Sequence, residues 1–227
     1  PAKCQNLGNI KYAASIAAQR PAAIAEINRP TVVAASTRDG EEQIIATAWQ
    51  EATTDNHLLV IVPRHPERLI SILKDLAIYN VAIRSRGELP TDKTEIYIAD
   101  TFGELKSFMA HSELVIMGGS LVAKGGQNLI EPASMGRAII VGPHMENFAE
   151  ETSELLKQQA LVQLDHLNDG ETLSQKLSEL LSNLLRDPQK RKRLGERAEQ
   201  FVENHADVIE HYMAFVEKVV TAQDQSA

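Results

Sequence analysis

Residues 118–143 read GGSLVAKGGQNLIEPASMGRAIIVGP, and the interpretation of the whole chain starts from this stretch. It follows the apolar run Leu114–Met117 and contains two glycine pairs and a polar turn. Glycine pairs let a backbone approach a ligand closely or adopt a positive φ. Asn128 can cap a following helix, whose first turn offers free N–H groups and a positive dipole end. A strand, a glycine loop and a helix N-terminus together predict an anion site, most often for phosphate.

Short apolar runs alternate with amphipathic stretches through the middle of the chain. The predicted strands are Thr31–Ala35, Leu58–Val62, Glu95–Ile98, Leu114–Met117, Ala138–Val141 and Ala160–Gln163. The predicted helices are Glu41–Thr53, Glu67–Ile78, Gly103–Ala110, Leu129–Met135 and Glu146–Gln158. This alternation predicts βαβ units and a parallel sheet covered on both faces. Because such crossovers are right-handed, we expect an α/β fold with a doubly wound, Rossmann-like parallel sheet.

The chain divides into two predicted parts. The alanine-rich residues 1–30, with prolines at Pro21 and Pro30, are expected to be a linker and interdomain segment. Residues 31–227 are expected to form one Rossmann-like domain, with a helical tail from about residue 169. The tail should break at Asp187-Pro188 and around Asn204, where a helix pattern is interrupted.

Composition excludes several classes of protein. The 227 residues include 23 basic and 31 acidic side chains, so the net charge of −8 argues against a nucleic-acid-binding protein. The single cysteine, Cys4, excludes an internal disulfide, and the seven histidines show no metal-ligand spacing. No apolar run approaches the ~20 residues that span a bilayer. We therefore expect a soluble segment without bound metal, while an anchor upstream of it stays open.

Ligands of open parallel sheets bind where loops leave the carboxyl ends of strands. Polar or glycine-bearing loops follow four predicted strands: Ser36–Gly40, Pro63–Pro66, Gly118–Gly126 and Gly142–His144. The glycine loop is not a P-loop, since Lys124 precedes Gly125, and it lies too far along the chain for a dinucleotide fingerprint. These departures disfavour a P-loop NTPase and an NAD enzyme. A tight turn without a ligand remains the alternative.

Glu131 has two possible roles from its position. It lies three residues after Asn128, so it can complete a capping box. Its carboxylate can equally accept two hydrogen bonds from the vicinal hydroxyls of a ribose. The residues alone leave both roles open.

Basic side chains in these loops can supply charge for an anion. Arg64 stands in the rigid sequence Pro-Arg-His-Pro and suits a phosphate or carboxylate, although it can instead pair with Glu67 at the surface. Arg38 and Lys124 add two further cations, and the hydroxyl of Ser36 adds a donor. An acidic chain that binds an anion needs such local cations.

Three motifs follow one another in the second half of the sequence. They are GGSLV at Gly118–Val122, GGQNLIEP at Gly125–Pro132 and GPHMENF at Gly142–Phe148. Four shorter pieces accompany them at Gly8–Lys11, Ala35–Glu42, Pro63–Arg68 and Asp100–Leu105. In this order they resemble the C-terminal half of bacterial Kdo transferases, the 3-deoxy-D-manno-octulosonic acid transferases of lipopolysaccharide synthesis. The resemblance is strong over residues 7–150 and weak over the tail.

The resemblance implies the C-terminal half of a B-type two-domain glycosyltransferase. This half would bind the donor CMP-Kdo, from which Kdo is transferred to a lipid A precursor, and it would need no cofactor. The other half would carry the acceptor site, the membrane attachment and the catalytic carboxylate. The whole enzyme would work at the cytoplasmic face of the bacterial inner membrane. We therefore expect the isolated chain to bind nucleotide without turnover.

The resemblance also implies a set of donor-binding residues. Glu131 would hold the ribose, Arg64 would face the phosphate or the sugar carboxylate, and the glycine-loop backbone would surround the phosphate. The full set is Ser36, Arg38, Arg64, Gly119, Ser120, Lys124, Gly126, Gln127, Asn128, Glu131 and Asn147, with no catalytic residue in this chain. Gln127 departs from the family, which usually has histidine there; glutamine can donate a hydrogen bond but cannot carry a proton at neutral pH.

Two other functions remain open at the level of sequence. A UDP-sugar epimerase can share the fold and a ribose-binding glutamate, but it would prefer uridine nucleotides. A non-catalytic nucleotide-binding module would explain why no acid–base pair is visible. Base preference separates the first alternative from a Kdo transferase, and activity after addition of the other half separates the second.

Overall fold

A single parallel sheet organises the computed structural model, which describes residues 24, 27–52, 56–164, 167, 170–205 and 212–216. Within these residues the strand order is β3-β4-β2-β1-β5-β6-β7, and every neighbouring pair is parallel. The strands are β1 (Thr31–Thr37), β2 (Leu58–Pro63), β3 (Val81–Ile83), β4 (Ile96–Ile98), β5 (Leu114–Met117), β6 (Ala138–Val141) and β7 (Val162–Gln163). The predicted α/β fold with a parallel sheet is confirmed.

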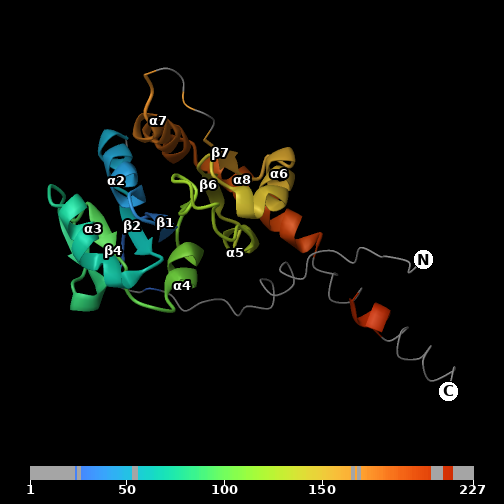
Figure 1. Cartoon of the computed structure of the whole chain (residues 1–227), viewed down its shortest axis with the longest axis horizontal. Helices are drawn as coiled ribbons and strands as arrows, with labels where there is room; N and C mark the ends of the chain where they lie inside the picture. Colours follow the sequence, from blue (N-terminus) through green and yellow to red (C-terminus); the bar gives the residue numbers. More distant parts are fainter. Residues whose placement is uncertain are drawn as a thin grey trace.

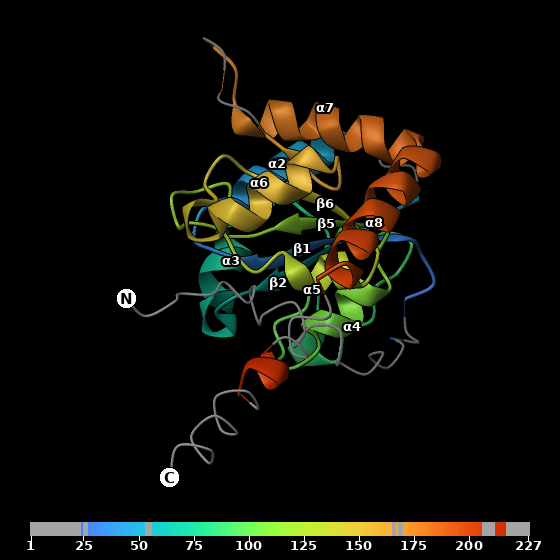
Figure 2. The ribbon, with the colours of Figure 1, turned by 90° about the vertical axis from the view of Figure 1, so that its right-hand side faces the viewer.

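Helices cover both faces of this sheet (Figures 1 and 2). The α-helices are α2 (Glu41–Glu51), α3 (Leu69–Asp75), α4 (Leu105–Ala110), α5 (Ile130–Ser134), α6 (Ala149–Lys157), α7 (Leu173–Arg186) and α8 (Pro188–Glu203). Short 3-10 turns are η1 (Pro66–Arg68), η2 (Arg84–Arg86) and η3 (Glu146–Phe148). One hydrophobic cluster packs α2, α3 and α7 on one face, and the other packs α4, α5, α6 and α8 on the opposite face. The sheet is therefore doubly wound.

Strand β1 lies at the centre and is buried along its whole length. Its alternate side chains enter the two clusters: Val33 and Ala35 face one, and Val32 and Ala34 face the other. From β1 the chain builds the sheet outward through β2, and later outward on the other side from β5. The order thus reverses between β1 and β5, which is where open α/β sheets place their ligands.

Most element bounds differ from the predicted ones by a few residues, and one strand was not predicted. The edge strand β3 is only Val81–Ile83, and it pairs with β4. The helices expected from Glu67 and Glu146 each begin with a 3-10 turn, η1 and η3. The helical tail is confirmed in α7 and α8. Most of the predicted linker 1–30 lies outside the described residues, as does Thr53.

The predicted break in the tail occurs where α8 begins. Asp187 is the N-cap of α8, and its Oδ1 accepts a hydrogen bond from the backbone N–H of Lys190 at 2.8 Å. Pro188 fills the first position, where a missing N–H costs nothing. No helix among the described residues has the length and apolarity needed to cross a bilayer.

Candidate functional site

The loops after β1 and β5 touch at the point where the strand order reverses. A Cβ placed on Gly118 would lie 2.3 Å from the carbonyl oxygen of Ser36, so only glycine permits this approach. The N–H of Gly118 also donates to the carbonyl of Ala35 at 2.7 Å. Ser36 itself is buried and has a φ of +56°, which is uncommon for a residue with a side chain. The sheet therefore brings these two predicted loops into direct contact.

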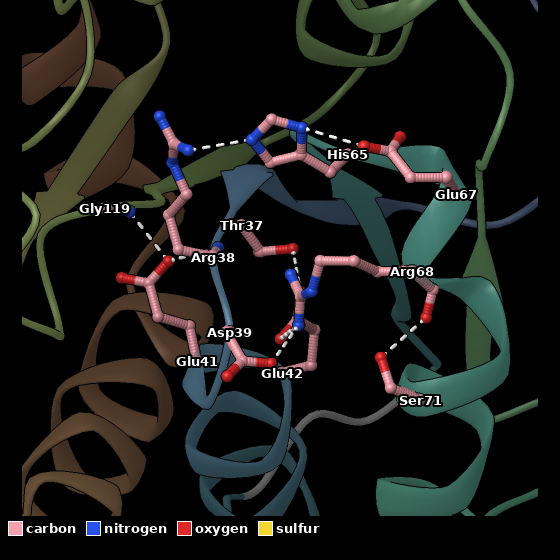
Figure 3. A network of polar contacts seen from close by, with 10 residues as sticks. All are labelled: Thr37, Arg38, Asp39, Glu41, Glu42, His65, Glu67, Arg68, Ser71 and Gly119. Carbon is pink, nitrogen blue, oxygen red and sulfur yellow. Dashed lines mark hydrogen bonds and ion pairs between the residues drawn. The ribbon is translucent and has the colours of Figure 1, made fainter.

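A buried carboxylate holds the two loops together (Figure 3). Glu41, at the start of α2, is fully buried and accepts hydrogen bonds from the backbone N–H groups of Gly119 at 2.7 Å and Leu121 at 2.9 Å. The N–H of Arg38 donates to the same carboxylate at 2.8 Å. Burial raises the pKa of Glu41, although the three N–H groups oppose that effect. The N–H of Gly119, which the resemblance assigns to a donor phosphate, is used inside the protein in this structure.

A second buried carboxylate fixes the next loop. Glu42 is fully buried and accepts a hydrogen bond from the hydroxyl of Thr37 at 2.7 Å. Both terminal nitrogens of Arg68 donate hydrogen bonds to the same carboxylate, at 3.0 and 3.1 Å. Nη2 of Arg68 also donates to the carboxylate of Asp39 at 2.9 Å. These contacts join α2 to η1. Neither Glu41 nor Glu42 was among the candidate residues; their signal was two successive acids opening a helix directly after Gly40.

The rest of the glycine loop folds onto the loop after β6. The N–H of Gly126 donates to the carbonyl of Gly119 at 2.7 Å, and both Gly125 and Gly126 have φ near +80°. Asn147 lies against Gly125: its N–H donates to the Gly125 carbonyl at 3.0 Å, and its amide nitrogen lies 3.4 Å from the carbonyl of Lys124. The side chain of Lys124 is exposed. Asn147 thus holds the glycine loop through both its backbone and its side chain, and Lys124 is exposed to solvent.

Ser120 is buried and connects the loop after β5 to the loop after β6 through hydrogen bonds. Its hydroxyl donates to the carbonyl of Met117 and accepts from the N–H of Gly142 at 2.8 Å. A Cβ on Gly142 would lie 2.1 Å from the Ser120 carbonyl oxygen. Because its hydroxyl is used in both directions, the side chain of Ser120 has a structural role in this state.

The start of α5 leaves backbone donors available. The side-chain Oδ1 of Asn128 accepts from the N–H of Ile130 at 3.0 Å, which closes a turn just before the helix. The N-cap of α5 is Leu129, without a side-chain capping bond, so the prediction that Asn128 caps this helix is wrong. In the described part of the chain, the N–H groups of Gln127 and Asn128 donate to no protein acceptor. Both residues are partly exposed. These two N–H groups mark the side of the glycine loop on which an anion can approach, whereas the N–H of Gly126 is already bonded to the carbonyl of Gly119.

Glu131 pairs with a cation from the neighbouring helix. Its Oε1 lies 3.3 Å from Nζ of Lys106 on α4, and its side chain is 29% exposed. The capping-box role would instead direct this carboxylate to the backbone of Asn128, and the structure does not show that contact among the described residues. Glu131 is thus accessible, and a ribose would compete with Lys106 for it.

The two arginines of the site differ in their partners. Arg64 is exposed, and the side-chain pair with Glu67 that was considered for it does not form: Glu67 lies 3.1 Å from Nδ1 of His65 instead. Arg38 is half-buried and its Nη1 lies 2.9 Å from Nε2 of the same histidine. The Nε of Arg38 is buried without a hydrogen-bond partner among the described residues. Both guanidinium groups can therefore take an anion.

The described residues contain no group of three or more histidine, cysteine, aspartate or glutamate side chains arranged to hold a metal ion. What the described site residues offer a ligand is hydrogen-bond donors and positive charge, with one accessible carboxylate. Backbone N–H groups at the start of α5, two guanidinium groups and one accessible carboxylate suit a ligand with a phosphate and a diol.

Curated relatives match most of this chain. A 3-deoxy-D-manno-octulosonic acid transferase from Rickettsia felis is 32% identical over 223 residues, which cover 94% of this chain and 47% of the relative. The enzyme of the same name from Haemophilus influenzae is 35% identical over 173 residues, or 74% of this chain and 39% of the relative. This chain spans about half the length of the curated relatives it matches. No family model matches it.

Solved structures share the fold. The C-terminal CMP-Kdo binding domain of WaaA from Acinetobacter baumannii superposes with a TM-score of 0.69 at 29% identity, over 84% of this chain and 96% of that domain. The spinosyn rhamnosyltransferase SpnG superposes with a TM-score of 0.54 at 17% identity, over 89% of this chain and 48% of that protein. The second comparison bears on the fold alone.

Proposed function

We propose that this chain, which belongs to the 3-deoxy-D-manno-octulosonic acid (Kdo) transferases and corresponds to their C-terminal domain, binds the sugar nucleotide CMP-Kdo. Its fold is that of the C-terminal half of a B-type glycosyltransferase. The observation that carries the proposal is the match to the CMP-Kdo binding domain of the Acinetobacter baumannii protein over nearly the whole of that domain. The alternative of a uridine-nucleotide epimerase has no comparable support.

The geometry supports a specific arrangement of the donor. The phosphate would lie against the N–H groups of Gln127 and Asn128, which have no acceptor among the described residues. Arg38 and Arg64 would supply positive charge to this phosphate or to the carboxylate of Kdo. Glu131 would accept hydrogen bonds from the ribose hydroxyls after exchanging its contact with Lys106. Ser120 and the N–H of Gly119 would act indirectly, by shaping the loop.

The chemical contribution of this domain would be stabilisation of the leaving group. As Kdo departs from cytidylate, negative charge grows on the phosphate oxygens. Preorganised N–H groups and guanidinium groups stabilise that charge without a metal ion or cofactor. The acceptor, a lipid A precursor, and the general base would then belong to the other half of the enzyme, which would also attach it to the cytoplasmic face of the bacterial inner membrane. The isolated chain would bind donor without transferring Kdo.

Calorimetric titration of the 227-residue chain with cytidine and uridine monophosphates tests the donor assignment. Cytidylate should bind preferentially, and Glu131→Ala should weaken it by about tenfold or more, because hydrogen bonds to a charged group contribute about 1.5–3 kcal/mol. Glu179→Ala, which removes an exposed carboxylate on α7, is the matched control and should leave the affinity unchanged. A preference for uridylate, or an unchanged affinity in Glu131→Ala, would contradict the assignment.

A second assay tests whether donor binding and catalysis belong to different halves of the enzyme. The isolated chain, mixed with CMP-Kdo and a lipid A precursor, should release no cytidylate above the uncatalysed rate. Transfer of Kdo by the isolated chain would show that a catalytic base lies within these residues.

A further inference from the structure

His65 stands between a cation and an anion at the edge of the candidate donor site. Nη1 of Arg38 lies 2.9 Å from Nε2 of the imidazole, and Oε1 of Glu67 lies 3.1 Å from Nδ1 (Figure 3). The three side chains form one line, in which each nitrogen of the ring has a different partner. No role in donor binding has been given above to His65 or Glu67.

The chemistry of the three groups fixes the tautomer of the ring. A guanidinium can only donate hydrogen bonds, so Nε2 must be the acceptor in the contact with Arg38. The ring proton of a neutral imidazole then sits on Nδ1, where the carboxylate of Glu67 accepts it. His65 is therefore a neutral acceptor toward Arg38, and Glu67 selects that state.

The sheet places the histidine beside the arginine. Strands β1 and β2 are neighbours, with Thr37 opposite Pro63, and the N–H of Arg64 donates to the carbonyl of Thr37 at 3.0 Å. Arg38 directly follows the end of β1 and His65 comes two residues after the end of β2, so their side chains start from neighbouring loops at one edge of the sheet. The backbone of Arg38 is held as well, because its N–H donates to Glu41. The partners of the guanidinium are thus set by the fold.

The guanidinium of Arg38 keeps an unused donor. Its Nε is buried and has no hydrogen-bond partner among the described residues. A buried N–H without an acceptor destabilises the protein, and an anionic ligand that accepts its hydrogen bond removes that cost. Since His65 holds Nη1, the guanidinium cannot rotate freely, and the edge that contains Nε keeps one direction. That edge matches the paired oxygens of a phosphate or carboxylate.

We propose that His65 is a positioning residue: as a neutral acceptor fixed by Glu67, it holds the Arg38 guanidinium with its Nε edge toward the anionic group of the donor. The inference rests on the proposed donor-binding function. It predicts that donor affinity depends on a hydrogen-bond acceptor at the place of the His65 Nε2 atom, and not on the imidazole ring as such. Loss of His65 should free the guanidinium and weaken donor binding without removing any group that touches the nucleotide.

Cytidylate affinity of three variants at position 65 tests the acceptor. His65→Ala should weaken binding about 3- to 10-fold, the equivalent of one hydrogen bond. His65→Gln should restore the affinity to within about twofold, because its carbonyl oxygen reaches the place of Nε2 and can accept from Arg38. His65→Asn, whose shorter side chain reaches only the place of Nδ1, should behave as His65→Ala. A purely steric role would instead give the asparagine and glutamine variants similar affinities, since the two side chains fill the space similarly.

Coupling to Arg38 and the tautomer itself provide two further readouts. In an Arg38→Ala background, His65→Ala should cause no additional loss. In the wild-type chain, two-bond proton–nitrogen correlations of the imidazole at neutral pH should show Nδ1 protonated and Nε2 unprotonated.

The outcomes separate this inference from the proposed function. If wild type binds cytidylate and His65→Ala binds it equally well, the positioning role is wrong and donor binding stands. A glutamine variant as weak as alanine, a full additional loss in the Arg38→Ala background, or a ring protonated on Nε2 would each overturn the inference too. If wild type binds no nucleotide, both proposals fail together.

Discussion

The carboxylate of Glu41 lies 2.7 Å from the backbone nitrogen of Gly119, a residue 78 positions further along the chain. This hydrogen bond joins the start of α2 to the glycine loop after β5, across the point where the strand order reverses. The N–H of Gly119, which a glycine loop could otherwise offer to a phosphate, therefore donates its hydrogen bond to the carboxylate of Glu41. The donors left for a ligand lie further along the loop, at Gln127 and Asn128.

Removal of the Glu41 carboxylate should destabilise the domain. Glu41→Ala leaves three N–H groups without their acceptor, and each unpaired buried donor costs about 1–3 kcal/mol. We expect a loss of at least about 3 kcal/mol in the free energy of unfolding, and a smaller loss for Glu41→Gln, which keeps one acceptor oxygen. Urea titration followed by the fluorescence of Trp49, the single tryptophan and a buried residue of α2, measures both. Glu51→Ala, at the exposed end of the same helix, should change stability by less than about 0.5 kcal/mol.

The contact between the loops after β1 and β5 should not tolerate a side chain at Gly118. A methyl group there would lie 2.3 Å from the carbonyl oxygen of Ser36, which belongs to the backbone and cannot move aside cheaply. Gly118→Ala should therefore cost more than about 2 kcal/mol. Gly103→Ala is the matched control: Gly103 has a φ of +85° but open space around it, so only the backbone cost of about 1–2 kcal/mol applies. Equal unfolding midpoints for the two variants would contradict the steric argument.

The main strands were predictable because each is an apolar run that is followed within two residues by a polar residue or glycine. The strand β3 was not, because Val81–Ile83 is three residues long, and at the edge of the sheet Val81 is only half-buried. So short a run between Asn80 and Arg84 carries no periodic signal. Its place is decided by pairing with β4, which a local pattern does not reveal.

The two arginines of the Pro63–Arg68 motif should respond differently to substitution. Arg68 pairs with the fully buried Glu42, so Arg68→Ala leaves a buried charge unpaired and should cost about 3 kcal/mol or more. Arg64 is exposed, so Arg64→Ala should leave stability within about 0.5 kcal/mol while it weakens cytidylate binding. Urea unfolding of the two variants measures their stability, and calorimetric titration measures their affinity for cytidylate. Normal affinity in folded Arg64→Ala would remove this arginine from the donor site.

The meeting of the polar and glycine-bearing loops at one edge of the sheet was predictable, but the hydrogen bonds between those loops were not. Glycine pairs and polar residues after strands identified the loops, since those residue types have few other uses at strand ends. The hydrogen bond between Glu41 and Gly119, and that between Arg38 and His65, join residues from different loops. Such pairs depend on which strands become neighbours, so a single sequence could only supply the candidates.

Acid should remove the contribution of the Glu104 carboxylate to stability. Hydrogen bonds from Arg84, and then from Thr101, hold the pKa of this carboxyl below its ordinary range. A carboxyl whose pKa is lower in the folded state stabilises the protein fully above its unfolded-state pKa of about 4.3, and that stability is lost as the pH falls through the folded-state value. Because the pair is partly exposed, the contribution should stay below about 1 kcal/mol.

The comparison of wild type with Glu104→Gln across pH isolates this contribution. Urea midpoints should differ at neutral pH, with the variant less stable, and the difference should shrink once the pH falls below about 4, because the protonated carboxyl then resembles the amide. Glu179→Gln, which alters an exposed carboxylate on α7, should follow wild type at every pH. A difference between wild type and Glu104→Gln that persists undiminished in acid would mean that the side chain stabilises the loop through packing, since packing does not depend on ionisation.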